Sequence, residues 1–259
     1  MIKIMPKVIM LLELFAAGKE FSVKEVIAHT GLNQSSVSHL LKSLCEENML
    51  ERIRYGKYRR GARLIQLCIG HNPWQELISK AERCADNLMT WLNELAVIGM
   101  RDHDRRLTIV KRWPLKSLQV DQDSARIYPA NWYETANGRI LLAYAPSDIV
   151  RQVVRQYGLP ERNIWREAAT LPKLEKELER IRKQGFTAMD VDELVRALGV
   201  PIRDASSEFT MSLSTAYPVF SCRKKEEEII RYMQERASIL EEELRIGGIR
   251  IIDLKQKDR

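Results

Sequence analysis

A cluster of short polar side chains stands at the start of a helix that the sequence predicts directly after Asn33, a residue type that caps helices. Val37, Leu40 and Leu44 recur at helical spacing and form its inner face. Short hydrogen-bonding side chains on a rigid helix can face base edges in a DNA major groove, and the free N–H groups at the helix start can bind phosphate. An ordinary solvated polar face explains this helix equally well. The candidate base-contacting residues are Gln34, Ser35, Ser36, Ser38, His39 and Lys42.

A basic segment follows this helix and decides between the two interpretations. Two short strands, Leu50–Ile53 and Lys57–Arg60, are predicted around a turn at Tyr55, and the run from Arg52 to Arg63 contains six lysines and arginines and no acid. Like charges this close destabilise an isolated hairpin, so an anionic partner is the simplest explanation. A helix-turn-helix followed by a basic two-stranded wing predicts DNA binding. The wing residues expected to contact DNA are Arg54, Lys57, Arg59 and Arg60.

Residue types that catalyse reactions or bind metals do not form a recognisable pattern in this chain. The sequence Asp102-His103-Asp104 is typical of a solvated hairpin turn. The four cysteines lie far apart, without a CxxC pair or a histidine at ligand spacing, which indicates buried reduced thiols and no metal site. No GxSxG, HExxH, P-loop or GxGxxG motif occurs. We therefore predict that the protein is not an enzyme and needs no cofactor.

The length and the distribution of charge predict two domains with different partners. The chain has 259 residues, of which 45% are hydrophobic, and this length fits two domains better than one. Residues 1–70 hold 11 lysines and arginines against 6 acids, a net charge of +5, whereas the rest of the chain holds 31 against 29. Positive charge concentrated in a small unit indicates a polyanion partner there. We predict domains over residues 1–70 and 71–259.

The N-terminus has some features of a signal peptide but fits a helix better. Lys3 and Lys7 precede an apolar stretch that Glu13 interrupts, and the apolar residues from Val8 to Phe15 have helical spacing. No apolar run approaches the ~18 residues that cross a bilayer. The sequence predicts a cytoplasmic protein that does not contact a membrane.

The predicted elements give an α+β fold class. In the N-terminal domain, a helix from Lys7 to Ala16 is followed by a helix that Ser22 caps and Gly31 ends. A helix from Trp74 to Leu95 is expected to link the domains, and the tail after Gly248 is expected to be frayed. The strands expected in the larger domain are Ala96–Met100, Leu107–Trp113, Phe186–Asp190, Val195–Ile202 and Glu208–Thr215. Its further helices are expected over Ala136–Tyr144, Ser147–Tyr157, Leu171–Gln184 and a long final segment through Ile229–Leu244.

Several motifs in order resemble those of the IclR family of bacterial and archaeal regulators, across nearly the whole chain. The run GKYRRGARLIQL, Gly56–Leu67, resembles the family's wing and the segment that follows it. In the larger domain, the similar segments are Thr135–Arg139, Arg182–Phe186, Gly199–Ile202 and Ser212–Ser214.

The resemblance implies a winged helix-turn-helix joined to a GAF- or profilin-like effector domain with an antiparallel sheet around a small-molecule pocket. It also implies a homodimer or a dimer of dimers on palindromic double-stranded operator DNA. By this resemblance, the pocket would be lined by the backbone amides of Ala136 and Asn137, an acid near Asp190 and the hydroxyls of Ser212 and Ser214. Helix-start N–H groups and two hydroxyls at i and i+2 on a strand can hold a carboxylate.

The chain departs from the family pattern around this pocket. Ala197 stands where many members have a cysteine, and Leu194 replaces a common glycine. The loop between Asp190 and Val195 is about two residues shorter than in the family pattern, so either Asp190 or Asp192 could occupy the acidic position. A domain that only oligomerises remains an alternative, in which Ser212 and Ser214 face solvent or a neighbouring strand. A different winged-helix family is a weaker alternative, because a long α/β domain follows the wing.

Overall fold

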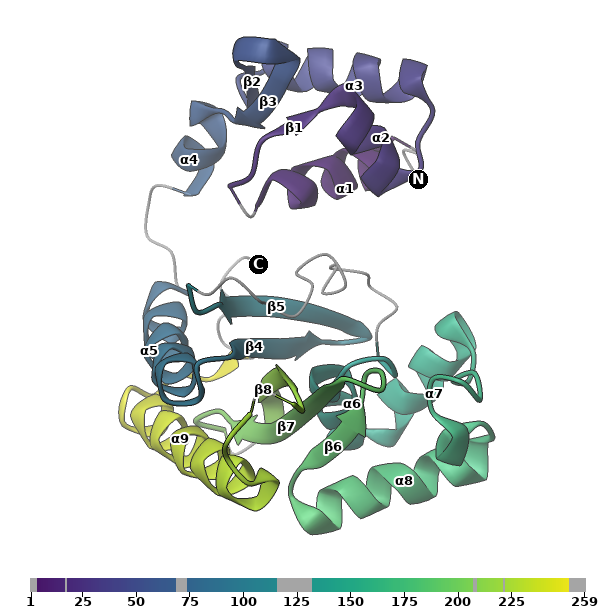
Figure 1. Ribbon diagram of the computed structural model, residues 1–259, viewed down its shortest axis with the longest axis vertical. Coiled ribbons are helices and arrows are strands. Elements are labelled where there is room, and N and C mark those ends of the chain that lie inside the picture. Colours follow the sequence, from purple (N-terminus) through teal and green to yellow (C-terminus); the bar gives the residue numbers. More distant parts are fainter. Residues whose placement is uncertain are drawn as a thin grey trace. The chain divides into compact units, whose positions relative to one another are not determined.

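The computed structural model describes residues 4–16, 18–68, 74–115, 132–206, 209–220 and 222–251 (Figure 1). The chain divides into two compact units, Met1–Asn72 and Pro73–Arg259. Both units mix helices with antiparallel strands, which confirms the α+β class. Among the described residues, no helix is both long and apolar enough to cross a bilayer. Glu208, the expected first residue of a strand, lies outside the described residues.

The N-terminal unit is a winged helix-turn-helix. Three helices enclose an apolar core that includes Phe15, Val26 and Leu41, all fully buried. The three-stranded sheet has the order β1-β3-β2, so β3 is its central strand. The elements are α1 (Met5–Ala16), β1 (Phe21–Ser22), α2 (Val23–Thr30), α3 (Gln34–Glu46), β2 (Leu50–Arg52), β3 (Lys57–Arg60) and α4 (Ala62–Cys68).

Local sequence signals position α2 and α3 as predicted. Ser22 and Glu25 form a reciprocal capping box at the start of α2, and Gly31 ends that helix with φ 67°. The Asn33 side chain accepts a hydrogen bond of 2.8 Å from the Ser36 amide at the start of α3. The predicted caps are therefore confirmed, and they fix where the polar face of α3 begins.

The second unit is built on a five-stranded antiparallel sheet with the order β5-β4-β8-β7-β6. Figure 1 shows α5 and α9 together beside this sheet, and α7 and α8 grouped near its other end. Its strands are β4 (Leu95–Asp102), β5 (Arg105–Arg112), β6 (Thr187–Asp190), β7 (Val195–Arg203) and β8 (Phe209–Pro218). Its helices are α5 (Gln75–Leu92), α6 (Ala136–Ala143), α7 (Ser147–Tyr157), α8 (Leu171–Gln184) and α9 (Glu226–Ile246).

The two faces of this sheet are covered differently. One face packs against α5 and α9 through a large apolar cluster that includes Leu88, Leu213 and Met233. The other face is covered by α6, which packs on β7 and β8 and also contacts β4 and β6. The outer side of α6 joins α7 and α8 in a separate apolar cluster. Within the part of the chain that the structure describes, the sheet therefore lies between a thick apolar layer and one helix, α6.

Two expectations for this unit are wrong at their edges. The helix expected to reach Leu95 ends at Leu92, because Asn93 caps it with a left-handed backbone (φ 56°), and Leu95 begins β4. The tail after Gly248 is not frayed as far as Ile251, because Ile249 and Ile251 are buried and the Asp204 carboxylate accepts a 2.8 Å hydrogen bond from the Ile251 amide. Apolar burial outweighs the terminal position in this segment.

Candidate functional site

The outer face of α3 carries the residues expected to contact bases. Gln34, Ser35, Ser38 and His39 are exposed, whereas Ser36 is half-buried and its amide is bound by the Asn33 cap. The polar atoms at the start of this helix therefore remain on the surface, where a nucleic acid could reach them.

One turn later, Lys42 lies 3.8 Å from Glu46, and both side chains are solvent-exposed. An exposed pair at i and i+4 contributes little stability, so Lys42 can exchange this partner for a phosphate.

The wing is less crowded by like charge than its sequence indicates. Glu51 of β2 lies directly opposite Arg59 of β3 and accepts a hydrogen bond from its guanidinium. The Arg63 guanidinium likewise donates to the carboxylate of Glu47, just after α3. Part of this positive charge is therefore neutralised by acids outside the run Arg52–Arg63, because strand pairing places Glu51 beside Arg59 and the return of the chain after β3 places Glu47 beside Arg63.

The remaining wing residues differ in position. Lys57 pairs in register with Ser22 of β1, and Arg60 lies close to Gly18. Arg54 stands at the turn between β2 and β3 and is exposed. Among the described residues, Arg54 forms no ion pair. The tip of the wing thus presents positive charge that is not neutralised within this part of the chain.

In the second unit, α6 begins against the sheet at two glycines. Thr135 caps the helix by accepting a 3.0 Å hydrogen bond from the Gly138 amide. A Cβ atom at Gly99 of β4 would lie within 2.5 Å of the Asn137 side-chain amide, and one at Gly199 of β7 would lie 3.0 Å from the Ala136 carbonyl oxygen. The first turn of α6 approaches the sheet closely because these positions have no side chain.

The buried side chain of Arg139 holds the start of α6 in place. The Arg139 guanidinium donates to the carbonyl oxygens of Tyr133 and Ile164, each at 2.8 Å, and stacks over the Trp165 ring at 4.2 Å. Burial lowers the pKa of Arg139 to about 10, which leaves it charged at neutral pH. Arg139 is therefore a structural residue that fixes the loop before α6.

The Asn137 amide and the Ser212 hydroxyl face this interface without hydrogen-bond partners. Ser212 of β8 pairs in register with Gly99, which the Asn137 side chain covers. Asn137 is 3% exposed and Ser212 is 0% exposed. Neither the two amide atoms nor the hydroxyl oxygen has a partner among the described residues. Buried polar atoms are normally hydrogen-bonded, so this group is an exception that needs an explanation.

Ser214 and Ala197 complete the same face of the sheet. Ser214 contacts the Val97 carbonyl oxygen only at 3.5 Å, the outer limit for a hydrogen bond. Ala197 packs with Ala136 and Met189 in a small apolar cluster. The structure therefore brings together five of the six expected pocket residues: Ala136, Asn137, Ala197, Ser212 and Ser214.

Positive charge lies on the same face at the edge of the sheet. Arg106 of β5 pairs in register with Arg101 of β4, two residues from Gly99. Burial lowers the pKa of the Arg106 guanidinium, although Glu134, just before α6, raises it. The Arg106 Nε atom is buried and has no hydrogen-bond partner among the described residues. An anion near the start of α6 would meet a favourable potential.

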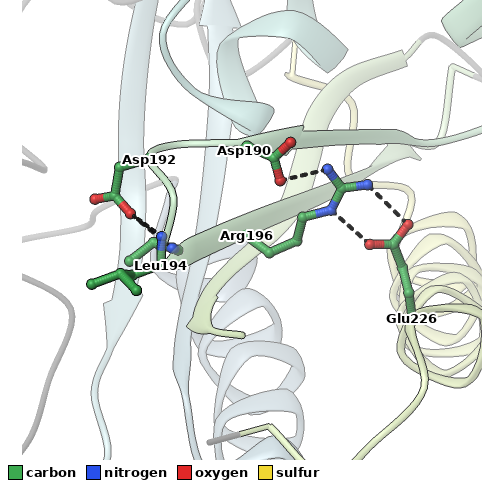
Figure 2. Close-up of polar contacts among 6 residues, drawn as sticks. Asp190, Asp192, Leu194, Arg196 and Glu226 are labelled. Atoms are coloured by element: carbon green, nitrogen blue, oxygen red, sulfur yellow. Dashed lines mark hydrogen bonds and ion pairs between the residues drawn. The ribbon is translucent and has the colours of Figure 1, made fainter. Parts of the chain in front are cut away.

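The sixth expected residue, Asp190, lies on the opposite face of the sheet (Figure 2). Its carboxylate accepts a 2.8 Å hydrogen bond from Arg196, whose guanidinium also binds Glu226 of α9. Asp192 instead closes the turn before β7, since its carboxylate accepts hydrogen bonds from the amides of Leu194 and Val195 at 2.7 and 2.8 Å. Neither acid belongs to the group beneath α6, which corrects the expected pocket acid.

Sequence reasoning missed Gly99, Gly199 and Arg106. The signal for the glycines was present, because an isolated glycine inside a strand often marks the close approach of another backbone. Arg106 gave no signal, because its inward position depends on the strand register. Within the described residues, no group of three or more His, Cys, Asp or Glu side chains could hold a metal ion.

The winged helix-turn-helix, together with an antiparallel-sheet domain, defines a DNA-binding transcriptional regulator. The sequence matches the helix-turn-helix domain of IclR over residues 7–54 and the C-terminal domain of IclR bacterial transcriptional regulators over residues 74–241. The chain therefore belongs to the IclR family. Its matched families and curated relatives are transcriptional regulators, so the chain is a regulator and not an enzyme.

Individual relatives cover most of the chain. The HTH-type transcriptional regulator KdgR of Escherichia coli K12 is 25% identical over 238 residues, which are 88% of this chain and 86% of that protein. The crystal structure of an IclR transcriptional regulator from Alicyclobacillus acidocaldarius gives a TM-score of 0.68 at 18% identity, covering 91% and 95% of the two chains. An IclR homolog from Microbacterium hydrocarbonoxydans, solved in complex with 4-hydroxybenzoate, gives 0.67 at 20% identity, covering 94% and 99%. These likenesses establish the shared fold.

Proposed function

We propose that this regulator binds a specific double-stranded operator through α3 and the wing, and that a small polar metabolite bound under α6 changes its affinity for that operator. The observation that carries the proposal is the buried and unpartnered polar group of Asn137 and Ser212. An unsatisfied buried donor or acceptor destabilises a fold, so such a group is retained where a ligand satisfies it.

The chemistry of the group favours a carboxylate ligand that also carries a hydroxyl group. A carboxylate can accept hydrogen bonds from the Asn137 amide nitrogen, the Ser212 hydroxyl and the N–H groups that begin α6. The Asn137 amide oxygen needs a donor, which a ligand hydroxyl supplies. The 4-hydroxybenzoate bound by the Microbacterium homolog has both groups. Ser214 and the charge of Arg106 would support the same anion.

Ligand entry requires the start of α6 to move. The Asn137 side chain lies against Gly99 and occupies the space above it. An open groove of about 730 Å³ lies between the end of α6, α7 and α8, but none of the proposed pocket residues lines it. A ligand must therefore displace Asn137 from Gly99, and this displacement is a local change that could alter operator affinity.

A thermal-shift screen of small carboxylates, with 4-hydroxybenzoate included and each acid matched by its neutral amide, tests the effector site. A true effector should stabilise the wild-type protein and change operator affinity by about 1–3 kcal/mol, and operator DNA should shift effector affinity by the same factor. The double variant Ser212→Ala and Ser214→Ala should lose both effects, while the surface control Ser147→Ala should keep them. Acids that stabilise the double variant equally would place the site elsewhere. A screen without hits would favour a domain that only oligomerises.

The DNA-reading role of α3 has its own test. Gln34→Ala should cost about 1–3 kcal/mol at one base pair of the operator and spare binding to random DNA. Gln152→Ala, at an exposed glutamine of α7 in the second unit, is the control. Selection from random DNA should return an altered motif for the first variant only, and an unchanged motif would remove Gln34 from the reading face. A palindromic motif would support the homodimer or dimer of dimers that the resemblance to the IclR family implies.

A further inference from the structure

A pair of arginines faces α6 beside the buried polar group of Asn137 and Ser212. Arg101 of β4 lies two residues from Gly99, so its side chain is on the face of the strand that Asn137 covers. Arg106 of β5 pairs in register with Arg101. Like charges directly opposite each other on neighbouring strands repel and weaken the pairing. The α6 face of the sheet therefore concentrates positive charge where β4 and β5 meet.

The charge of Arg106 is only partly neutralised by the described residues. Arg101 and Arg106 are both half-buried. The Nε atom of Arg106 is buried without a hydrogen-bond partner, and its guanidinium forms no ion pair in the described part of the chain. Glu134, just before α6, raises the pKa of Arg106, but burial lowers this pKa more strongly and the glutamate is itself exposed. A guanidinium can donate hydrogen bonds and accepts none, so this group needs an oxygen acceptor.

The surface between these arginines and Ser212 carries no bulky side chain. Thr108 of β5 pairs in register with Gly99, which in turn pairs with Ser212 of β8. The strand spacing separates β5 from β8 by about 10 Å, and Arg106 lies about 7 Å along its strand from Thr108. One carboxylate group bound at Ser212 does not span this separation. A longer molecule that displaces Asn137 and lies over Gly99 and Thr108 does.

We propose that Arg101 and Arg106 bind a second anionic group of the effector, so that the effector is a dianion with an anionic group at each end. Its first carboxylate binds Ser212 and the start of α6, and its second carboxylate or phosphate binds the two guanidinium groups. Arginine binds both kinds of anion through paired hydrogen bonds. The bound anion also offsets the repulsion between the facing arginines. This inference rests on the effector half of the proposed function, because it names the class of ligand that the site under α6 takes.

The experiment measures dissociation constants by isothermal titration of the full-length protein. The probes are glutarate, adipate and pimelate, each compared with its monomethyl ester, which keeps one carboxylate and the same carbon chain. 3-Phosphoglycerate and glycerate form the corresponding pair for a phosphate. The variants are Arg106→Gln and Arg101→Gln, so that the test remains decisive if one of them does not fold. Arg231→Gln, at an exposed arginine of α9 beyond the opposite face of the sheet, removes the same charge and is the control.

The dianion of the best length should bind the wild type about tenfold more tightly than its uncharged-end partner, because the partner loses the contact with the arginines. In Arg106→Gln and in Arg101→Gln this ratio should fall to about one, through weaker binding of the dianion alone. Arg231→Gln should keep the wild-type ratio. Without ligand, Arg106→Gln should unfold at the same temperature as the wild type or at a higher one, because one of two facing like charges is removed.

Equal affinity of the wild type for every dianion and its partner would overturn the second anionic site, as would binding of monocarboxylates alone. A preference for dianions that survives both arginine substitutions would also overturn it, because the second group would then bind elsewhere. An equal fall of the ratio in Arg231→Gln would assign the preference to net charge and contradict the proposal. If no acid of either kind binds the wild type, the effector site under α6 itself fails, and that failure is distinct from one confined to Arg101 and Arg106.

Discussion

The two faces of the five-stranded sheet carry different kinds of side chain, although the same strands form both. Along β8, Met211 and Leu213 point into the apolar cluster beneath α5 and α9, whereas Ser212 and Ser214 point toward α6. The first face has large apolar side chains, and its hydroxyl at Thr215 donates a 2.6 Å hydrogen bond to the Leu95 carbonyl oxygen. The second face has glycines, small residues and polar atoms without partners.

The difference separates the face that stabilises the domain from the face where we propose that a ligand binds. Burial of continuous apolar surface is the main source of stability, and the α5 and α9 face provides it. The α6 face can then keep unsatisfied polar groups that weaken the fold. The predictions below test this division. All five tryptophans lie at or after Trp74, so tryptophan fluorescence reports on the second unit alone.

The largest effect is expected for Leu213→Ala. Leu213 is fully buried in the apolar cluster, and its loss should lower the free energy of unfolding by about 2–5 kcal/mol, because apolar contacts are lost and a cavity remains. Guanidinium unfolding followed by tryptophan fluorescence measures this change. A loss below about 1 kcal/mol would contradict the view that this face carries the stability.

Gly99→Ala should destabilise the second unit by about 1–3 kcal/mol, because its Cβ would overlap the Asn137 amide. The same substitution should cost much less in an Asn137→Ala background, where the obstacle is absent. The double-mutant cycle isolates this interaction. Equal costs in the two backgrounds would show that Asn137 does not hold α6 over Gly99.

Removal of the two buried hydroxyls of β8, which lie on opposite faces of the sheet, should have different effects on the free energy of unfolding. Thr215→Val removes a hydrogen bond and leaves the Leu95 carbonyl oxygen without its partner, so it should cost about 1–2 kcal/mol. Ser212→Ala removes a buried hydroxyl that has no partner among the described residues. The free energy of unfolding without ligand should therefore stay the same or rise by up to about 1 kcal/mol. Chemical unfolding of the two variants side by side is decisive. Comparable destabilisation by both would mean that Ser212 is satisfied in solution.

The smallest effect is expected for Asp190→Ala. Its carboxylate is 72% exposed and pairs with Arg196, which keeps Glu226 as a second partner. The loss of this exposed pair should cost at most about 0.5 kcal/mol and should leave carboxylate binding unchanged. Isothermal titration with a carboxylic acid found in the screen measures the binding. Weaker binding to the variant would show that Asp190 belongs to the pocket.

The helices of the N-terminal unit could be predicted from its sequence because the residues that define them are close together in the chain. Ser22, Gly31 and Asn33 lie next to the helix ends that they fix, and the apolar spacing of α3 assigns its inner face without reference to other elements. The acids that pair with Arg59 and Arg63 could not be read in the same way. Glu51 and Glu47 become their neighbours only through strand pairing and the return of the chain after β3.

In the second unit, the sequence alone determined the type and order of the helices and strands, and it grouped Asn137, Ser212 and Ser214 as candidates through their resemblance to a family. Only the tertiary structure decided which residues share a face. A strand alternates its side chains with a period of two, so pairing of Met189 with Ala197 directs Met189 toward α6 and Asp190 toward α9. The partners of a side chain across a sheet depend on register and packing between distant segments, which no local pattern of residues specifies.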